Sequence, residues 1–245
     1  MPPSETKRDG GDGAPLDYAR LRFSRLTAKR RAVVRAVRAL ARDPEQAAAV
    51  LKLGPKQRGE LPRNRMVASS PTLPAIDRYT GVLYDALDAG SLPDDARARA
   101  AETVLVQSAL FGPVGALDPI PAYRLSHDSR LPGLPLKAHW AATVTRELRH
   151  AGPLLDLRSA GYAALGPLPD RDDTAYLRVL ARGGDGTTRA LNHFNKKAKG
   201  EFTRALLTAA DPPETLEDLL DWAPGAGFVV EAAGPRELAL VVTEG

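Results

Sequence analysis

Short apolar segments with two different periods alternate along this chain, and the alternation restricts its fold more than any other feature. Val33, Val37 and Leu40 recur at the spacing of one helix face, whereas residues 104–106 form a short unbroken apolar run that is typical of a buried strand. Because the predicted helices and strands are intermixed, we expect a fold of the α+β or mixed α/β class. We predict a single domain over residues 1–245, with a mixed sheet flanked by helices.

The predicted elements follow from caps, breakers and apolar spacing. The first twenty residues are rich in Gly, Asp and Pro and are predicted to form a loop. Helices are expected over residues 27–42, 44–51, 74–89, 93–101, 138–150, 195–209 and 215–223. Strands are expected at residues 104–106 and 154–159, as a hairpin of 175–181 with 188–194, and as a closing hairpin of 227–233 with 236–242. Residues 112–133, with four prolines, are expected to form a long loop, where functional residues often lie.

Positive charge is concentrated near the N-terminus. The net charge of the 245 residues is +4, but residues 1–65 hold 16 Lys or Arg against 7 Asp or Glu. The remainder holds 18 basic and 23 acidic residues. Such an asymmetric field attracts polyanions, with nucleic acid as the expected partner, although a merely solubilising surface would have the same composition.

A row of arginines follows the predicted helix over residues 27–42. The row consists of Arg31, Arg35, Arg38 and Arg42, which share one face of a helix because they recur every three or four residues. No acidic residue stands between Lys29 and Arg42, so like charges repel along this face unless an external group offsets them. We refer to these four residues as the arginine row and predict that Arg31, Arg35 and Arg38 bind nucleic acid.

Two further segments carry basic residues in positions that suit an anion. In residues 51–61, the turn around Gly54 and Lys56 is similar to the hairpin of a helix-hairpin-helix element, in which backbone N–H groups and a lysine bind one phosphate. An ordinary Gly-Pro break between helices is the alternative. Near the start of the predicted helix over 195–209, Lys196, Lys197 and Lys199 oppose the helix dipole, which suggests a compensating anionic ligand.

Several segments, in order, resemble the YaaA family, the peroxide-stress-response proteins of bacteria. They are PPSETK (2–7), DRYTGVLYDAL (77–87), SALFGPVGALDPIPAYRL (108–125), KAHWAATVTREL (137–148), LLDLRSAGYAAL (154–165), FNKKAKGEFTRALL (194–207) and GFVVE (227–231). The resemblance implies one mixed α/β domain with a basic cleft, a helix-hairpin-helix-like element, DNA binding and protection of DNA under peroxide stress. It implies that the cleft uses Lys7, Tyr123, Arg124, Lys196, Lys197 and Lys199.

One departure from the family concerns the N-terminus. Family members begin with a short apolar strand before the PPSE motif, whereas Met1 stands here where that strand should end. If the strand is absent, a neighbouring strand is expected to keep an unpaired edge, and the position of Lys7 is in doubt.

Two functions from different classes remain open. The first is largely sequence-independent DNA binding, because no set of base-reading side chains on a recognition helix is evident. The second is an enzyme that acts on a nucleotide or nucleobase, with the basic cleft as phosphate subsite and Glu5, Lys7 and Tyr123 as catalytic residues. No Walker A, G-x-S-x-G or G-x-G-x-x-G motif occurs, so we expect binding rather than catalysis.

The composition also argues against several other classes. The chain has no cysteine, which excludes disulfides and thiolate metal sites and is typical of a cytoplasmic protein. Its four histidines, at positions 127, 139, 150 and 193, have no metal-ligand spacing, so neither a metal nor another cofactor is predicted. No segment reads as a membrane span or a signal peptide, and no obligate protein partner is evident.

Overall fold

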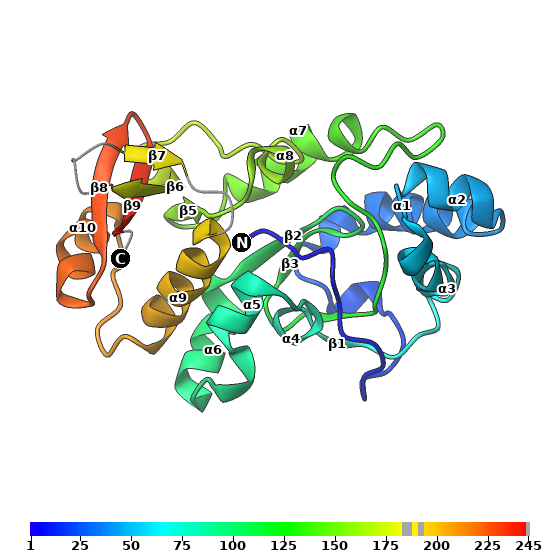
Figure 1. The fold of residues 1–245 in the computed structure, drawn as a ribbon, viewed down its shortest axis with the longest axis horizontal. Helices are drawn as coiled ribbons and strands as arrows, with labels where there is room; N and C mark the ends of the chain where they lie inside the picture. The colour runs from blue at the N-terminus through cyan, green and yellow to red at the C-terminus, as the bar shows by residue number, and fades with distance from the viewer. Residues whose placement is uncertain (183–187, 191–193, 244–245) are drawn as a thin grey trace. The chain divides into compact units, whose positions relative to one another are not determined.

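The computed structural model describes residues 1–182, 188–190 and 194–243. The fold mixes helices and strands, which confirms the predicted class (Figure 1). The chain divides into two compact units, each assembled from three segments. Unit 1 comprises Met1–Thr80, Ala101–Leu148 and Arg158–Pro167, and unit 2 comprises Gly81–Ala100, Arg149–Leu157 and Leu168–Gly245.

Unit 1 begins with short helical turns and a long helix. Its helical elements are η1 (Tyr18–Arg20), η2 (Ser24–Leu26), α1 (Thr27–Leu40), α2 (Pro44–Val50), η3 (Pro55–Glu60), α3 (Leu61–Arg65), α4 (Ala75–Arg78), α7 (Leu136–Leu148) and α8 (Ala160–Ala163). The α1 helix buries Val33, Val37 and Leu40, as their spacing predicts. Asp43 caps α2 by accepting hydrogen bonds from two backbone N–H groups, and Pro44 fits the first helical position.

The strands of unit 1 are short and form two antiparallel pairs. They are β1 (Leu73–Pro74) with β4 (Pro119–Ile120), and β2 (Leu105–Ser108) with β3 (Gly112–Gly115). The backbone of Met1 meets β2, since the Met1 amino group donates to the Leu105 carbonyl at 2.7 Å and the Gln107 N–H donates to the Met1 carbonyl at 3.1 Å. The edge that was expected to be unpaired therefore has a partner in Met1.

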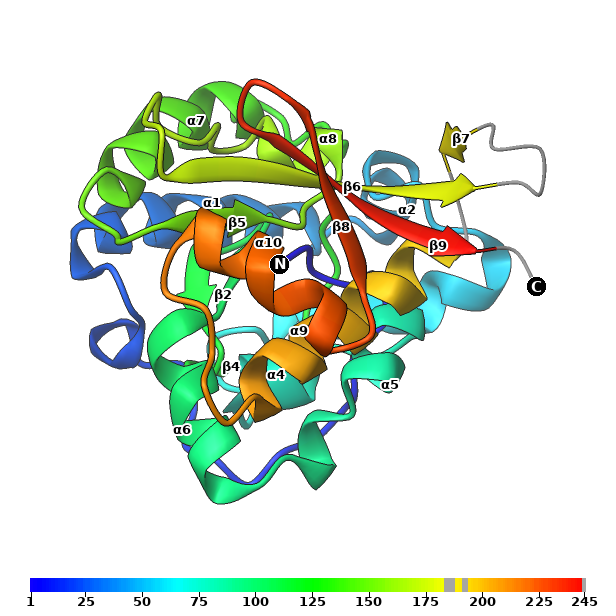
Figure 2. The same cartoon turned by 90° about the vertical axis from the view of Figure 1, so that its left-hand side faces the viewer.

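Unit 2 is built on one mixed sheet, visible in Figure 2 with the order β5-β6-β9-β8 and β7 beside β6. Its elements are α5 (Val82–Leu87), η4 (Ala89–Ser91), β5 (Leu154–Asp156), β6 (Thr174–Arg182), β7 (Thr188–Ala190), α9 (Phe194–Thr208), α10 (Leu216–Gly225), β8 (Val229–Gly234) and β9 (Glu237–Thr243). The α6 helix (Asp94–Thr103) crosses the boundary at residue 100. Both predicted hairpins are confirmed as antiparallel pairs, but the second strand of the first is shorter than predicted: only 188–190 pair with β6, and Phe194 already begins α9. Residues 183–187 and 191–193 lie outside the described residues.

The core of unit 2 follows from strand alternation. Ala175, Leu177 and Val179 recur every second residue of β6 and face one side of the sheet. Against them pack Phe202 of α9 and Leu219 of α10. The two helices therefore share one buried face of the sheet, which accounts for the amphipathic spacing of both segments.

Two predictions about elements are wrong. The helix expected over residues 74–89 is interrupted between α4 and α5, because Tyr79 is extended and Gly81 has a φ of 96°, which a helix cannot accommodate. The loop expected over 112–133 begins instead as β3. Gly112, at a φ of 68°, turns the chain back, so that the following residues pair with β2. Among the described residues, no helix has both the length and the apolarity needed to cross a membrane.

Candidate functional site

The backbone around Lys7 is fixed by the extended residue that interrupts the predicted helix. Lys7 forms an antiparallel bridge with Tyr79, flanked by hydrogen bonds from the Arg8 N–H to the Arg78 carbonyl at 2.9 Å and from the Thr80 N–H to the Thr6 carbonyl at 3.2 Å. The buried guanidinium of Arg78 reinforces the segment. It donates hydrogen bonds to the carbonyls of Arg8, Gly10, Pro71 and Ile120. Lys7 thus occupies a defined position, which answers the doubt about it raised by the sequence.

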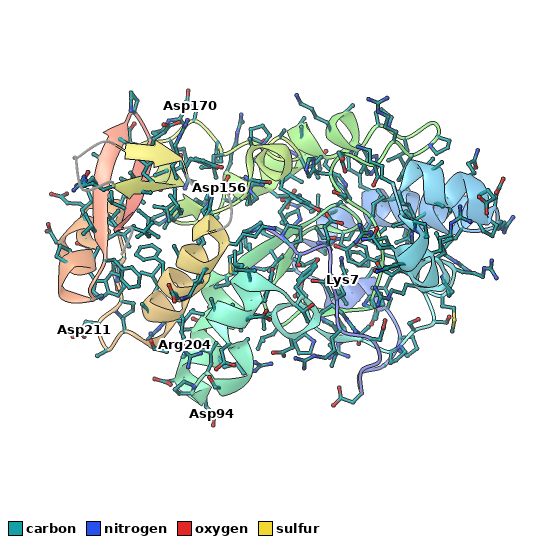
Figure 3. The ribbon with its side chains drawn as sticks, in the orientation of Figure 1. Lys7, Asp94, Asp156, Asp170, Arg204 and Asp211 are labelled. Atoms are coloured by element: carbon teal, nitrogen blue, oxygen red, sulfur yellow. The ribbon has the colours of Figure 1, made fainter. Side chains whose placement is uncertain are left out.

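The Lys7 side chain points into unit 1 and is buried (Figure 3). Its Nζ donates to the Ser4 carbonyl at 2.9 Å and lies 4.2 Å from the centre of the Tyr123 ring and 5.2 Å from that of Tyr79. Burial removes water from the ammonium group and is the main cause that lowers the pKa of Lys7 from 10.5 to about 7, while the nearby carboxylate of Glu5 opposes this shift. At neutral pH this amine is therefore present in both its charged and its neutral form.

The two tyrosines beside the Lys7 amine belong to a chain of hydroxyl groups. The Ser108 Oγ lies 2.8 Å from the Tyr123 hydroxyl, which in turn lies 2.8 Å from the Tyr79 hydroxyl. Because Ser108 Oγ already accepts hydrogen bonds from the N–H groups of Leu110 and Phe111, its proton is directed to Tyr123. Tyr123 can then donate to Tyr79. Burial raises the pKa of Tyr79 to about 12, so both phenols keep their protons at neutral pH.

Two carboxylates and two arginines complete the cluster around Lys7. Arg124 Nη1 lies 3.3 Å from Glu5 Oε2 and 3.6 Å from Glu60 Oε2. Arg63 contacts the same Glu60 oxygen at 3.2 Å and forms a two-pronged ion pair with Asp9, whose pKa is lowered chiefly by that hydrogen bond. We call Glu5, Lys7, Glu60, Arg63 and Arg124 the Lys7 cluster. All five belong to unit 1.

The arginine row differs from the Lys7 cluster in exposure and in partners. All four of its side chains are exposed. Arg31 lies over the Tyr18 ring at 5.4 Å, and no residue in the described part of the chain forms an ion pair with any of the four. Nearby Lys52 and Arg58, in contrast, pair with Asp128 and Glu45. The row is a set of unneutralised positive charges, three of them on α1; Arg42 lies two residues past the end of α1, so the prediction that all four share one helix is wrong.

Comparison with known proteins assigns the family. The family model described as peroxide stress protein YaaA matches residues 1–233. The chain belongs to the peroxide stress protein YaaA family. It is 43% identical over 237 residues to a UPF0246 protein of Corynebacterium glutamicum strain R, covering 94% of this chain and 93% of that protein. A UPF0246 protein of Streptomyces coelicolor is 43% identical over 246 residues, covering 97% and 93%.

Within this member of the YaaA family, the residues predicted to bind nucleic acid fall into two groups. Exposed on the surface are Arg31, Arg35, Arg38, Lys56, Lys196 and Lys197. Buried are Lys7, Tyr123, Arg124 and Lys199. Lys199 donates to the Leu157 carbonyl at 2.9 Å, and burial lowers its pKa to about 8. Lys196, Lys197 and Lys199 belong to unit 2, whereas the other seven belong to unit 1.

Sequence reasoning missed several residues of the Lys7 cluster and its surroundings. Glu60 and Arg63 lie outside the segments that resemble the family and join the cluster only through the fold, whereas Ser108 begins one of those segments (108–125). Tyr162 lies in one of the segments that resemble the family, and its hydroxyl approaches Glu5 Oε1 at 3.4 Å. Residues 127, 139 and 150 are the histidines that the structure describes, and His193 lies outside the described residues. In the described part of the chain, no three His, Asp or Glu side chains gather as metal ligands would.

Proposed function

We propose that this protein acts in the peroxide stress response as a DNA-binding protein, and that the arginine row binds the phosphates without regard to sequence. Membership of the YaaA family supports the role in the stress response. The observation that supports DNA binding is the exposure of the row with no acidic partner among the described residues. Arginine binds phosphate oxygens through two parallel N–H groups, so such a row suits a polyphosphate backbone. The exposed Lys56 adds one more positive charge to unit 1.

The test is a salt series with double-stranded, bulged and single-stranded DNA. Each phosphate contact releases counterions, so affinity for DNA should fall steeply as salt rises. The double reversal Arg35→Glu with Arg38→Glu should weaken binding at low salt by at least roughly tenfold and make the logarithmic salt slope shallower by about two. Fluorescence anisotropy with labelled DNA measures both quantities.

A second pair of substitutions separates the row from overall charge. Lys196→Glu with Lys197→Glu changes the net charge by the same amount but lies in unit 2. Lys199 is left unchanged because it is buried. If both reversals cost the same affinity, net charge alone accounts for binding and the assignment to the row fails. Binding that does not depend on salt would contradict the proposal as a whole.

A second function, acid–base chemistry on a nucleotide or nucleobase, is supported by a separate observation. The Lys7 amine, with a pKa of about 7, can both accept and return a proton at neutral pH, and Glu5 lies beside it. If Lys7 is the base, turnover of a nucleotide panel followed by chromatography should rise with pH through about 7 and vanish in Lys7→Met. A folded Lys7→Met variant with unchanged turnover would contradict this assignment.

A further inference from the structure

Two carboxylate oxygens of the Lys7 cluster are buried without a hydrogen-bond donor. Glu5 Oε2 and Glu60 Oε2 accept no hydrogen bond within the described part of the chain. Both lie near Arg124 Nη1, at 3.3 and 3.6 Å, and Glu60 Oε2 also lies 3.2 Å from Arg63 Nη1, but none of these ion-pair contacts is a hydrogen bond. Most buried acceptors in proteins are satisfied, because an unsatisfied one loses its hydration with nothing in exchange. Two such oxygens beside one guanidinium indicate a ligand that donates to both.

The unsatisfied oxygens lie close to the surface. The side chain of Glu5 is 42% exposed and that of Glu60 is 20% exposed, although the Oε2 atom of each is covered. Arg124 itself is 8% exposed, and its backbone is held by the Asn64 side chain. The Arg124 N–H donates to Asn64 Oδ1, and Asn64 Nδ2 donates to the Arg124 carbonyl, both at 2.7 Å. The segment that carries Arg124 is thus held in place, and the partly exposed side chains of Glu5 and Glu60 must move for a ligand to reach the two covered acceptors.

The charges of the cluster restrict the chemistry of that ligand. Lys7, Arg63 and Arg124 surround the two carboxylates, so a metal ion or an organic cation would meet three basic groups. An anion would face the unsatisfied carboxylate oxygens. An uncharged group with adjacent N–H donors satisfies both conditions. The pattern required is two donors next to one acceptor, the acceptor being placed for the Arg124 guanidinium.

Among the nucleobases, guanine offers this pattern on its pairing edge. Its N1–H and N2–H₂ groups are donors, and its adjacent O6 is an acceptor. Adenine and cytosine each have a single amino donor beside an acceptor on that edge, and thymine has a single N–H between two acceptors. We propose that Glu5, Glu60 and Arg124 bind the pairing edge of an unpaired guanine, the two carboxylates accepting from N1–H and N2–H₂ and Arg124 donating to O6. The proposal rests on the second proposed function for its ligand class, but binding needs no turnover.

Calorimetric titration with matched nucleotides tests the proposal. Guanosine, inosine, adenosine and 1-methylguanosine 5′-monophosphates carry the same phosphate, so differences among them report on the base. Inosine lacks the N2 amino group, and the 1-methyl compound lacks the N1–H. We expect each loss to weaken binding by roughly tenfold, as expected for a hydrogen bond to a charged acceptor, and adenosine monophosphate to bind at least as weakly.

Isosteric substitutions assign the effect to the two carboxylates. Glu5→Gln and Glu60→Gln should each remove most of the preference for guanosine over inosine or 1-methylguanosine. Glu45→Gln is the matched control, because Glu45 is exposed, pairs with Arg58 and lies outside the cluster. Thermal unfolding of each variant checks that it is folded. Equal affinity for the four nucleotides, or a guanine preference that survives both substitutions in folded protein, would overturn the proposal.

A second arm identifies the source of the base. Oligothymidine strands with and without one central guanine are titrated under the same conditions, with the Arg35→Glu and Arg38→Glu protein in parallel. Tighter binding of the guanine strand assigns the site to unpaired guanine in DNA, whereas a preference confined to the mononucleotides assigns it to free nucleotides. Salt-dependent DNA binding with no guanine preference in either arm would refute this site and leave the arginine row intact.

Discussion

The ammonium group of Lys7 loses its hydration on folding, and the pKa of Lys7 is lowered from 10.5 to about 7. Between these pH values the unfolded chain holds a proton that the folded chain has released. The free energy of unfolding should therefore rise with pH from about 7 to about 10, by roughly 1 kcal/mol per pH unit from this residue. Below pH 7 the contribution of Lys7 is constant and unfavourable.

Lys7→Met tests this linkage, because it keeps an unbranched side chain that is one atom shorter and removes the proton site. Relative to the wild type, the variant should be most stable below pH 7 and should lose that advantage as the pH rises toward 10. Urea unfolding at pH 6, 7.5 and 9 measures the difference. Parallel pH profiles for the two proteins would show that burial does not shift the protonation of Lys7.

Single residues of the candidate site were predictable from the sequence only when a local sequence pattern included them. The resemblance to the YaaA family singled out Lys7 in PPSETK. The helix period also carries a signal for Arg30, which stands three residues before Val33 and seven before Val37 and so falls on the buried face of α1. Glu60 could not be predicted, because its meeting with Arg124, 64 positions along the chain, is a product of the fold.

Among the elements, α9 and α5 of unit 2 pack closely through a glycine. A Cβ atom built on Gly200 would lie 2.2 Å from the Leu83 carbonyl oxygen and 2.8 Å from the Ala86 Cβ. Gly200→Ala should therefore destabilise the protein by about 1–3 kcal/mol, because the backbones must separate. Gly225→Ala, in α10, is the control, since its Cβ meets nothing within 4 Å. Urea unfolding should show a loss for the first and not for the second.

Elements with strong caps or breakers were predictable, and those set by distant pairing were not. Asp43 and Pro44 mark the start of α2, and Thr215 caps α10 within a residue of the predicted start. The apolar spacing over residues 74–89 indicated a continuous helix, but Tyr79 is extended because it pairs with Lys7. A local pattern contains no information about a partner more than seventy residues away.

The whole molecule consists of two units, and the chain passes from one unit to the other five times, after residues 80, 100, 148, 157 and 167. Residues 168–245 hold most of the unit 2 sheet but lack β5, which pairs with β6, and α5, which packs on α9. This fragment should therefore show no cooperative unfolding transition, whereas the full chain should. Circular dichroism during thermal unfolding makes the comparison, and a sharp transition in the fragment would mean that its sheet is stable without the earlier segments.

Arg30 has a consequence for the electric field of unit 1. Its guanidinium donates hydrogen bonds to the backbone carbonyls of Arg22, Phe23, Phe111 and Pro113. These peptide carbonyls are dipoles and carry no net charge. Although burial lowers the pKa of Arg30 to about 10, the group is still cationic at neutral pH. Peptide dipoles do not cancel the net charge of an ion. Arg30 therefore adds a full positive charge to the electric field at a distance from the protein. Long-range attraction of polyanions should thus persist in part when every exposed arginine of α1 has been removed.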